Sequence, residues 1–268
     1  MKIRLLGTAA AEGIPAFYSD SRVSNHAREH GGRNVRSRAA ALVDGCLKID
    51  LGPDTLMQMH RDRLDARDWL AVLFTHSHDD HFTPSELQYG LHPFSHCEHM
   101  PFPIYANESI IRRISEMYPD WPMELVVTRS FQTTQIGPYN VTPIRANHLL
   151  EEDSHNLLIE SGGKTLLYGT DTGWWQDASW EHLAGVKIDL LVIECTNGNT
   201  QSDYFGHMGI PDVLRVVERM NQIGAINGDT KLVSTHHSHN GNMTYDELVL
   251  ALEPHGIVAG YDGLEVEI

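Results

Sequence analysis

Three histidines and two aspartates stand close together at positions 76–81, within the stretch LFTHSHDDHFTPSE. Imidazole nitrogens and carboxylate oxygens are ligands for zinc, and they also suit manganese and iron. Side chains two residues apart in an extended segment point the same way, so His76 and His78 can reach one ion together. Asp80 and His81 lie where the chain leaves this segment, and they can face a second ion. The pattern predicts a metal site in preference to a chance cluster of polar residues on a loop.

The segments that flank this cluster predict an α/β protein. Short apolar runs rich in β-branched residues are expected to form strands at 2–7, 39–45, 46–50, 69–75, 156–161, 164–170, 188–194 and 231–236. Helices are expected at 211–223, after Thr244, and after Thr83, where Thr83-Pro84-Ser85-Glu86 has the form of a capping box. We therefore expect a single domain over residues 1–268, with strand-rich halves packed sheet on sheet and helices outside.

The charge and cysteine content of the chain limit the molecules that it is expected to bind and the compartment in which it is expected to work. The formal net charge is −16, from 20 basic and 36 acidic residues, and it disfavours binding to long nucleic acid. The arginine-bearing stretch at 27–40 could cradle an anion, although a solvated loop is the preferred interpretation. No apolar run approaches the length of a membrane span, and we do not expect the first residues to act as a signal peptide, because their apolar run is short and soon interrupted by glycine. The three cysteines, Cys46, Cys97 and Cys195, are odd in number and far apart, which favours a reducing cytoplasm over a disulfide framework.

The pattern His-x-His-x-Asp-His after a strand resembles the signature of the metallo-β-lactamase fold superfamily, and the other expected pieces follow in order. The segment VDGCLKIDLGPD is similar to the family's early Asp-x-Gly element, with Asp50 as the residue that fixes a loop or supports a ligand. His148 matches the third histidine, Asp171 the bridging aspartate and His236 the last histidine. The resemblance implies a four-layer αββα sandwich of two mixed sheets flanked by helices.

The resemblance also implies two divalent ions, zinc or manganese, with iron as a further option. The implied ligands are His76, His78 and His148 for one ion, Asp80, His81 and His236 for the other, and Asp171 between the two. This arrangement leaves room for a bridging hydroxide, and two ions can stabilise the charge that develops on a reacting phosphoryl or acyl group.

Two further segments resemble the phosphodiesterase branch, which contains tRNA 3′-processing endonucleases and phosphoribosyl cyclic phosphodiesterases. They are LVIECTNGN, with Glu194, and DYFGHMGIPDVLRVV, with His207. In that branch the equivalent of His207 contacts the phosphate and acts as a general acid, and Glu194 would orient a histidine. A plain helix flank and a plain strand-end carboxylate are the alternatives. We take His207 and Asp80 as the candidate catalytic residues.

The layout of the whole chain is most similar to the phosphoribosyl cyclic phosphodiesterases, which implies a small phosphorylated metabolite, cyclic or linear, as the partner. Residues 16–38 lack the cysteines with which that group holds a structural zinc, and His26 and His30 are interpreted as exposed loop residues. That zinc is therefore expected to be absent. The chain also lacks the long basic arm of the RNA-processing enzymes. A dinuclear acyl hydrolase, such as a lactonase or thioesterase, and a non-catalytic member that binds a small molecule are the alternatives, and a homodimer is left open.

A second histidine-rich segment, HPFSHCEHM at residues 92–100, contains His92, His96, Cys97 and His99. Its spacing matches no tight structural metal site. We interpret it as a lid or as a wall of the substrate pocket, with additional metal binding as the alternative.

Overall fold

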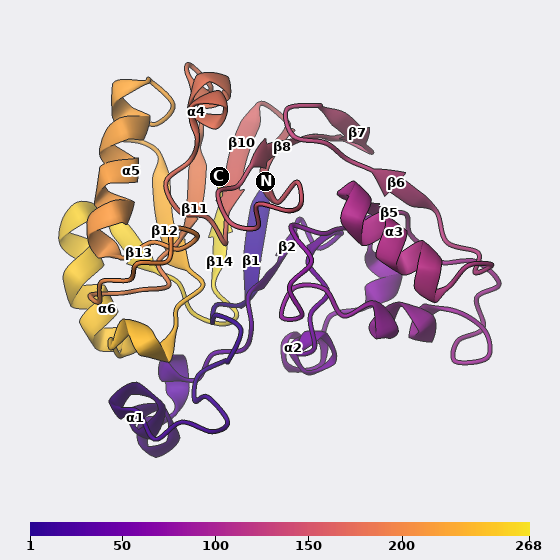
Figure 1. The fold of residues 1–268 in the computed structure, drawn as a ribbon, viewed down its shortest axis with the longest axis horizontal. Helices are drawn as coiled ribbons and strands as arrows, with labels where there is room; N and C mark the ends of the chain where they lie inside the picture. Colours follow the sequence, from indigo (N-terminus) through magenta and orange to yellow (C-terminus); the bar gives the residue numbers. More distant parts are fainter.

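Two seven-stranded mixed sheets form the centre of the protein in the computed structural model, which describes all residues from 1 to 268 (Figure 1). The first sheet contains, in spatial order, β14 (Glu265–Glu267), β1 (Lys2–Gly7), β2 (Ala40–Val43), β3 (Leu47–Ile49), β4 (Ala71–Leu73), β5 (Ile104–Ala106) and β6 (Leu125–Val127). The second contains β13 (Ile257–Ala259), β12 (Lys231–Thr235), β11 (Leu190–Glu194), β10 (Lys164–Gly169), β9 (His155–Ser161), β8 (Tyr139–Arg145) and β7 (Thr134–Ile136).

Helices cover the outer faces of both sheets. The α-helices are α1 (Arg22–His30), α2 (Thr55–Asp62), α3 (Glu108–Met117), α4 (Asp177–Leu183), α5 (Ile210–Gln222) and α6 (Tyr245–Leu252). The short 3₁₀ turns are Gly32–Asn34, Ala66–Asp68, Pro84–Gly90, His239–Gly241 and Glu253–His255. Figure 1 shows α5 and α6 on the side of the second sheet, α2 and α3 on the side of the first, and α1 projecting from the body. None of these helices combines the length and the apolar character that crossing a bilayer would require.

The alternation of side chains along the strands produces three apolar layers. In β10, Leu166 and Tyr168 point to the core between the sheets, whereas Leu167 points to the core beneath α4, α5 and α6. A third cluster packs Ile110 and Ile114 of α3 against the other face of the first sheet. Because both faces of each sheet are covered, inner strands such as β2 and β4 are apolar along their whole length. The structure therefore confirms the predicted four-layer αββα sandwich.

The parallel strands of the two sheets end at a common edge. Strands β3 to β6 are parallel in the first sheet, and β10 to β13 are parallel in the second. The register of β11 and β12 sets Glu194 opposite Thr235, so His236 follows at the same level. Asp171 follows β10, the neighbour of β11, by two residues. The carboxyl ends of parallel strands are the usual position of ligand sites in α/β folds.

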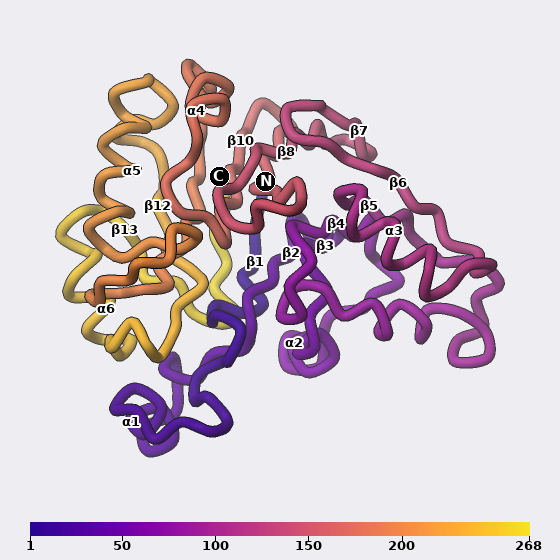
Figure 2. The backbone as a smooth tube through the Cα atoms, viewed as in Figure 1, coloured from indigo at the N-terminus to yellow at the C-terminus, as the bar shows by residue number.

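The two chain ends meet near the middle of the molecule, at the β14 edge of the first sheet (Figure 1). The α-amino group of Met1 donates to the carbonyl of Ile268 at 3.1 Å, and β1 pairs with β14. Figure 2 shows the indigo and yellow ends of the tube side by side. The first and last segments of the chain therefore help to build the same sheet.

All the predicted strands and the helix at 211–223 are present, the latter shifted by one residue at each end. The capping box at Thr244 is also confirmed, because its hydroxyl accepts from Glu247 N while the Glu247 carboxylate accepts from Thr244 N. The helix predicted after Thr83 is wrong. Residues 84–90 form a tight 3₁₀ turn, and the Thr83 hydroxyl donates to the Asp79 carbonyl instead of capping it.

The preferred interpretation of residues 27–40 as a solvated loop is also wrong. Part of this stretch belongs to α1, and Arg36 is buried, with only 3% of its surface exposed. Its guanidinium donates to the Thr8 hydroxyl at 2.8 Å and to the Gly260 carbonyl at 2.6 Å. These contacts join the start of the chain to its end, a relationship that local sequence patterns do not reveal.

Candidate metal centre

The first group of converging side chains consists of three histidines. His76 and His78 lie just beyond β4, and His148 lies beyond β8 in the other sheet. His78 Nδ1 lies 3.1 Å from His76 Nε2 and 3.0 Å from His148 Nε2. Nitrogens bound to one tetrahedral zinc ion at about 2.1 Å would lie about 3.4 Å apart. The spacing of these three atoms fits a single metal ion.

The second group lies beside the first and contains two carboxylates. His81 Nε2 is 3.1 Å from an oxygen of Asp80 and 3.1 Å from an oxygen of Asp171. His236 Nε2 is 3.1 Å from the other oxygen of Asp171. Both histidine atoms are buried and have no hydrogen-bond partner. Buried polar atoms without partners are costly, and a cation between them and the carboxylates would remove that cost.

Asp171 stands between the two groups. Its Oδ1 atom lies 3.8 Å from His76 Nε2 and 3.7 Å from His148 Nε2, whereas Oδ2 faces His81. One carboxylate therefore faces the nitrogens of both groups. The donor set of imidazole nitrogens and carboxylate oxygens suits divalent ions.

Hydrogen bonds behind the cluster fix the orientation of the histidines. In four of them Nδ1 has an oxygen partner, which turns Nε2 towards the cluster. The pairs are His76 with Thr75 Oγ1 at 3.0 Å, His81 with Asp50 Oδ2 at 2.7 Å, His148 with Gly206 O at 3.0 Å, and His236 with Thr196 Oγ1 at 2.8 Å. Asp50 also accepts from the backbone and the hydroxyl of Thr75. It thus contacts both ends of the segment that carries the histidines.

The backbone at the cluster is unusual in two ways. Asp50, Asp171 and His236 have positive φ angles of 58°, 50° and 55°, a conformation that L-residues adopt at a cost and that is common at functional sites. Gly52 approaches the carbonyl of Asp80 so closely that a Cβ at residue 52 would lie 2.0 Å from that oxygen. The Asp-x-Gly element therefore contributes both a carboxylate and the space in which the loop at 76–81 turns.

The electrostatics of the cluster favour an added positive charge. Burial alone would raise the pKa of Asp171, but His236, His81 and His76 lower it well below its usual value. Burial alone would lower the pKa of His81, but Asp171, Asp80 and Asp50 raise it well above its usual value. For His76 burial prevails and lowers the pKa. The carboxylates are thus charged and His76 is neutral, the forms in which both bind metals.

His207 lies beside the cluster and is held by Glu194. The Nδ1 atom of His207 donates to Glu194 Oε1 at 2.8 Å, and the centroid of its imidazole ring lies 4.9 Å from that of His148, with the two rings tilted against each other. Burial opposes charge on His207, but Glu194, with smaller contributions from Asp171 and Asp80, raises its pKa to about 9. Glu194 is itself fully buried at the end of β11.

A pocket of about 650 Å³ opens over the cluster. Both predicted groups reach it, through His78 and Asp80, and so does His207. No residue of 92–100 lines this pocket. His96 and Cys97 instead line a separate apolar pocket against Leu56 and Trp69. The histidines of this segment also form no cluster suited to a metal ion.

Sequence reasoning missed several residues of the site. Thr196 joins Glu194 to His236, because its hydroxyl donates to Glu194 Oε2 at 2.5 Å and accepts from His236. Tyr204 and Glu12 line the pocket from two distant segments. Thr196 stands two residues after Glu194, so its proximity could have been inferred, but nothing in the sequence around Glu12 identifies it as a pocket residue.

Comparison with known proteins agrees with this geometry. The family described as "Beta-lactamase superfamily domain" matches residues 47–237. A crystal structure of a diphosphatase from the PhnP family is similar over all of this chain and 97% of its own, with 22% identity and a TM-score of 0.73. Zinc-bound PqqB from Methylobacterium extorquens matches over the full length of both chains, with 19% identity and a TM-score of 0.73. The crystal structure of the short form of human tRNase Z is similar over 100% of this chain and 99% of its own, with 19% identity and a TM-score of 0.66. No curated protein sequence matches the chain.

Proposed function

The chain belongs to the beta-lactamase superfamily as a hydrolase of the metallo-β-lactamase fold, and from this premise we propose that it hydrolyses small phosphodiesters with the aid of divalent metal ions. The proposed ligands are His76, His78 and His148 for one ion, Asp80, His81 and His236 for a second, and Asp171 for both. Zinc or manganese would suit these donors, and so would iron.

The observation that carries the proposal is the placement of His207. It stands at the wall of the pocket over the cluster, where its Nδ1 atom is already used by Glu194. Its Nε2 atom is therefore the one left to meet a substrate. A protonated imidazole there can donate to a phosphoryl oxygen or to the oxygen that leaves when a diester is cleaved. Glu194 maintains that protonated form and the ring's orientation.

Divalent ions held by the cluster would polarise the phosphoryl group and lower the pKa of a water molecule. The chain's own residues bind those ions, orient the substrate and supply the proton. Asp50 keeps His81 in position through the 2.7 Å contact, and Thr196 does the same for His236. Asp80 faces the pocket directly, next to the reacting group in this scheme.

The surroundings support a small substrate. A pocket of about 650 Å³ is the size of a metabolite site, and its lining is predominantly polar. The net charge of −16 repels a long phosphate backbone, whereas a single phosphoryl group could be held locally by metal ions. All three cysteines are free, which supports the proposal that the protein works in the reducing cytoplasm.

The decisive experiment compares phosphodiesters with lactones and thioesters on the zinc- or manganese-loaded protein. We expect turnover of a cyclic phosphodiester or of bis(4-nitrophenyl) phosphate, and a large loss in His207→Ala with metal content retained. The matched control is His255→Ala, which alters an exposed histidine in the last 3₁₀ turn. Cleavage of lactones or thioesters without any phosphodiester turnover would instead establish an acyl hydrolase.

A further inference from the structure

The three-histidine group of the metal centre is assembled from both sheets. His76 and His78 follow β4 of the first sheet, whereas His148 follows β8 of the second. Their donor atoms can share one ion only if the two segments are held at a fixed separation, because metal ligands must stand close to their ideal positions. The contacts between these segments therefore decide whether the group can bind an ion.

Charged side chains hold both backbone groups of Ser77, the residue between His76 and His78. Its amide nitrogen donates to Glu152 Oε1 at 2.8 Å, and its carbonyl accepts from Arg113 Nη1 at 2.9 Å. Glu152 lies in the loop between β8 and β9, and Arg113 lies in α3. The amide belongs to the peptide bond shared with His76, and the carbonyl to the one shared with His78. The orientation of both peptide bonds is therefore fixed from outside the segment.

The loop that provides Glu152 also carries His148. Where this loop ends, the amide of His155 donates to the Thr75 carbonyl at 2.8 Å. The contact between Glu152 and Ser77 thus continues a connection between the second sheet and the segment after β4. One loop positions both the third histidine and the peptide between the other two.

Glu152 is an unusual residue to find at this position. It is buried, with 8% of its surface exposed, and it has no cationic partner within 4.0 Å. A buried carboxylate without an ion pair costs free energy, and an apolar side chain would stabilise the fold at least as well. Its presence is explained by the charge-assisted hydrogen bond that it accepts from Ser77.

Arg113 contacts the same loop at two points. Besides the bond to the Ser77 carbonyl, its guanidinium carbon lies 5.0 Å from the ring centroid of Phe82, the residue after His81. A guanidinium at this distance is attracted to the face of an aromatic ring. Arg113 therefore contacts the histidine-bearing loop both near its beginning and at its end.

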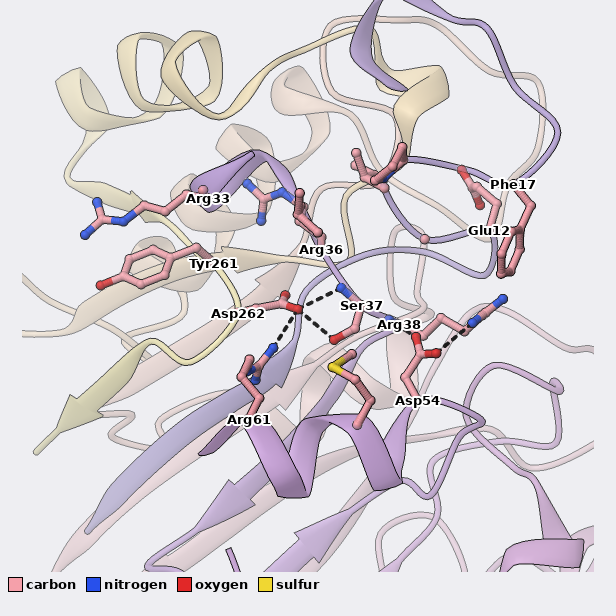
Figure 3. Close-up of a pocket in the computed structure, with 16 residues that line it drawn as sticks. Glu12, Phe17, Arg33, Arg36, Ser37, Arg38, Asp54, Arg61, Tyr261 and Asp262 are labelled. Atoms are coloured by element: carbon pink, nitrogen blue, oxygen red, sulfur yellow. Dashed lines mark hydrogen bonds and ion pairs between the residues drawn. The ribbon is translucent and has the colours of Figure 1, made fainter. Parts of the chain in front are cut away.

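Other carboxylates of the protein hold a distant backbone amide in the same way. Asp262 accepts from Ser37 N at 2.7 Å in the pocket drawn in Figure 3, and Asp189 accepts from Thr165 N at 2.9 Å. Neither amide adjoins a proposed metal ligand. Glu152 differs from both, because the amide from which it accepts separates two such ligands.

We propose that Glu152 and Arg113 are positioning residues, which set the zinc affinity of the three-histidine group by fixing the backbone between His76 and His78. Neither residue lines the pocket over the metal centre, so both act through that backbone and not on the substrate. The proposal rests on the proposed function, since it takes the three histidines as ligands of one ion.

Zinc affinity, measured by competition with a chromophoric chelator, tests the proposal. We expect Glu152→Ala to bind one of two zinc ions at least about tenfold more weakly, the usual effect of removing a partner that orients ligands, and to bind the other as wild type does. Glu152→Gln should recover much of the affinity, because its amide oxygen can still accept from Ser77 N. A residue that serves only the stability of the fold would lower the melting temperature and leave zinc affinity unchanged.

A double variant identifies the ion that is affected. His78→Ala removes a proposed ligand of the three-histidine group. If Glu152 acts on that group alone, adding Glu152→Ala to His78→Ala should leave the affinity for the remaining ion unchanged. Further weakening at the remaining ion would overturn the proposal, because Glu152 would then act on the whole centre.

Arg113 provides a second test from the other side of Ser77. Arg113→Met is expected to weaken the same ion as Glu152→Ala, and Arg113→Lys should have a smaller effect, because it retains one donor. Arg113 is only half-buried, so its variants test the proposal even if circular dichroism shows that Glu152→Ala does not fold. Wild-type zinc affinity in Arg113→Met would remove this residue from the proposal.

The matched control is Asp189→Ala. It breaks a similar bond between a carboxylate and a backbone amide, at the ends of β10 and β11 opposite the metal centre. We expect it to lower the melting temperature and leave zinc affinity unchanged. The proposal is overturned if Glu152→Ala behaves like Asp189→Ala, with both ions bound as tightly as in wild type, and this result leaves the proposed function intact. Wild-type protein that binds no zinc would overturn the proposed function itself, and this proposal with it.

Discussion

Glu194 Oε1 lies 2.8 Å from His207 Nδ1, and this contact connects a fully buried carboxylate to a histidine at the wall of the pocket. The other oxygen of Glu194 accepts from Thr196, which in turn accepts from His236. One carboxylate therefore orients both the proposed acid and a residue of the metal cluster. Glu194, the last residue of β11, therefore contacts the proposed acid directly and the metal cluster through Thr196.

Replacing Glu194 by Gln tests this connection. The amide keeps the shape of the side chain but loses the charge that maintains the proton on His207. We expect kcat for a phosphodiester to fall about 10- to 100-fold, the usual effect of removing a partner that orients a ligand or an acid. Glu218→Gln, on the exposed face of α5, is the control. Unchanged kcat in Glu194→Gln would show that His207 does not depend on this carboxylate.

Asp171→Asn should cause most of the bound metal to be lost. Residue 171 has a φ of 50°, which Asn tolerates well, so the substitution removes charge with little backbone strain. Because Asp171 faces the nitrogens of both groups, we expect metal affinity to fall by more than about 100-fold. Mass spectrometry of the metal content after dialysis measures this, with Asp177→Asn in the first turn of α4 as the control. A variant with its full metal content would rule out a shared ligand at this position.

Removal of metal by a chelator should lower the melting temperature. The cluster sets buried histidines beside two charged, buried carboxylates, and ions that bind only the folded state stabilise it. At an ion concentration of 100 times Kd the linkage contributes about 2.7 kcal/mol. Scanning fluorimetry before and after EDTA treatment, followed by zinc or manganese, measures the effect. An unchanged Tm in protein shown to be metal-free would contradict the proposed role of the cluster.

Gly52→Ala is expected to damage both stability and metal binding. The new methyl group would lie 2.0 Å from the carbonyl of Asp80, and backbone atoms must move to accommodate it. Overpacking of this kind typically costs about 1–3 kcal/mol, and here the displaced loop carries Asp80 and His81. Urea denaturation and metal titration measure the two effects. Gly228→Ala is the control, because a methyl group there meets no atom within 4 Å. If the two variants had the same stability and the same metal affinity, the loop at 76–81 would be able to move aside at no cost.

The elements that could be predicted from the sequence are those whose pattern lies within a few consecutive residues. Strand Leu190–Glu194 is continuously apolar up to its last residue, because both faces of the sheet are covered, and it was predictable. The strands at 104–106, 125–127, 134–136, 257–259 and 265–267 have three residues each and were missed, because such short runs carry no periodicity. They form or flank the sheet edges, where neighbours in space rather than local sequence define the strand.

The residues of the candidate site also fall into those that local sequence predicts and those that it does not. The spacing of His76, His78 and His81 is local and identified the cluster directly. The joining of that cluster to His148 and His236 could be inferred only from the order of the family's motifs. The burial of Arg36 could not be inferred at all, because its acceptors lie 28 and 224 residues away along the chain. Partners at that separation leave no pattern in the surrounding residues.

Buried Lys48 should make the stability of the protein depend on pH in the alkaline range. Its side chain is fully buried on β3, and its ammonium group donates to the carbonyls of Ile49 and Asp50. Burial lowers the pKa of Lys48 to about 7, against 10.5 for a free lysine, while Asp50 opposes the change. Between these values the unfolded chain binds the proton more readily than the folded one. Wild-type stability should therefore rise as pH increases from 7 to about 10, by up to about 1.4 kcal/mol per pH unit.

Lys48→Met removes this titration while keeping a side chain of similar length. The folded protein no longer has to bury a charge, so the variant should be more stable than wild type at pH 7, by an amount on the order of a few kcal/mol. The advantage should shrink steadily towards pH 10, because the proton that wild type releases on folding is given up more easily as the pH approaches 10.5, the pKa of a free lysine. Urea denaturation at pH 7, 8, 9 and 10 measures this, with exposed Lys187→Met as the control. A difference between Lys48→Met and wild type that does not change with pH would mean that Lys48 stays charged in its buried position, because its two carbonyl partners compensate for the loss of water.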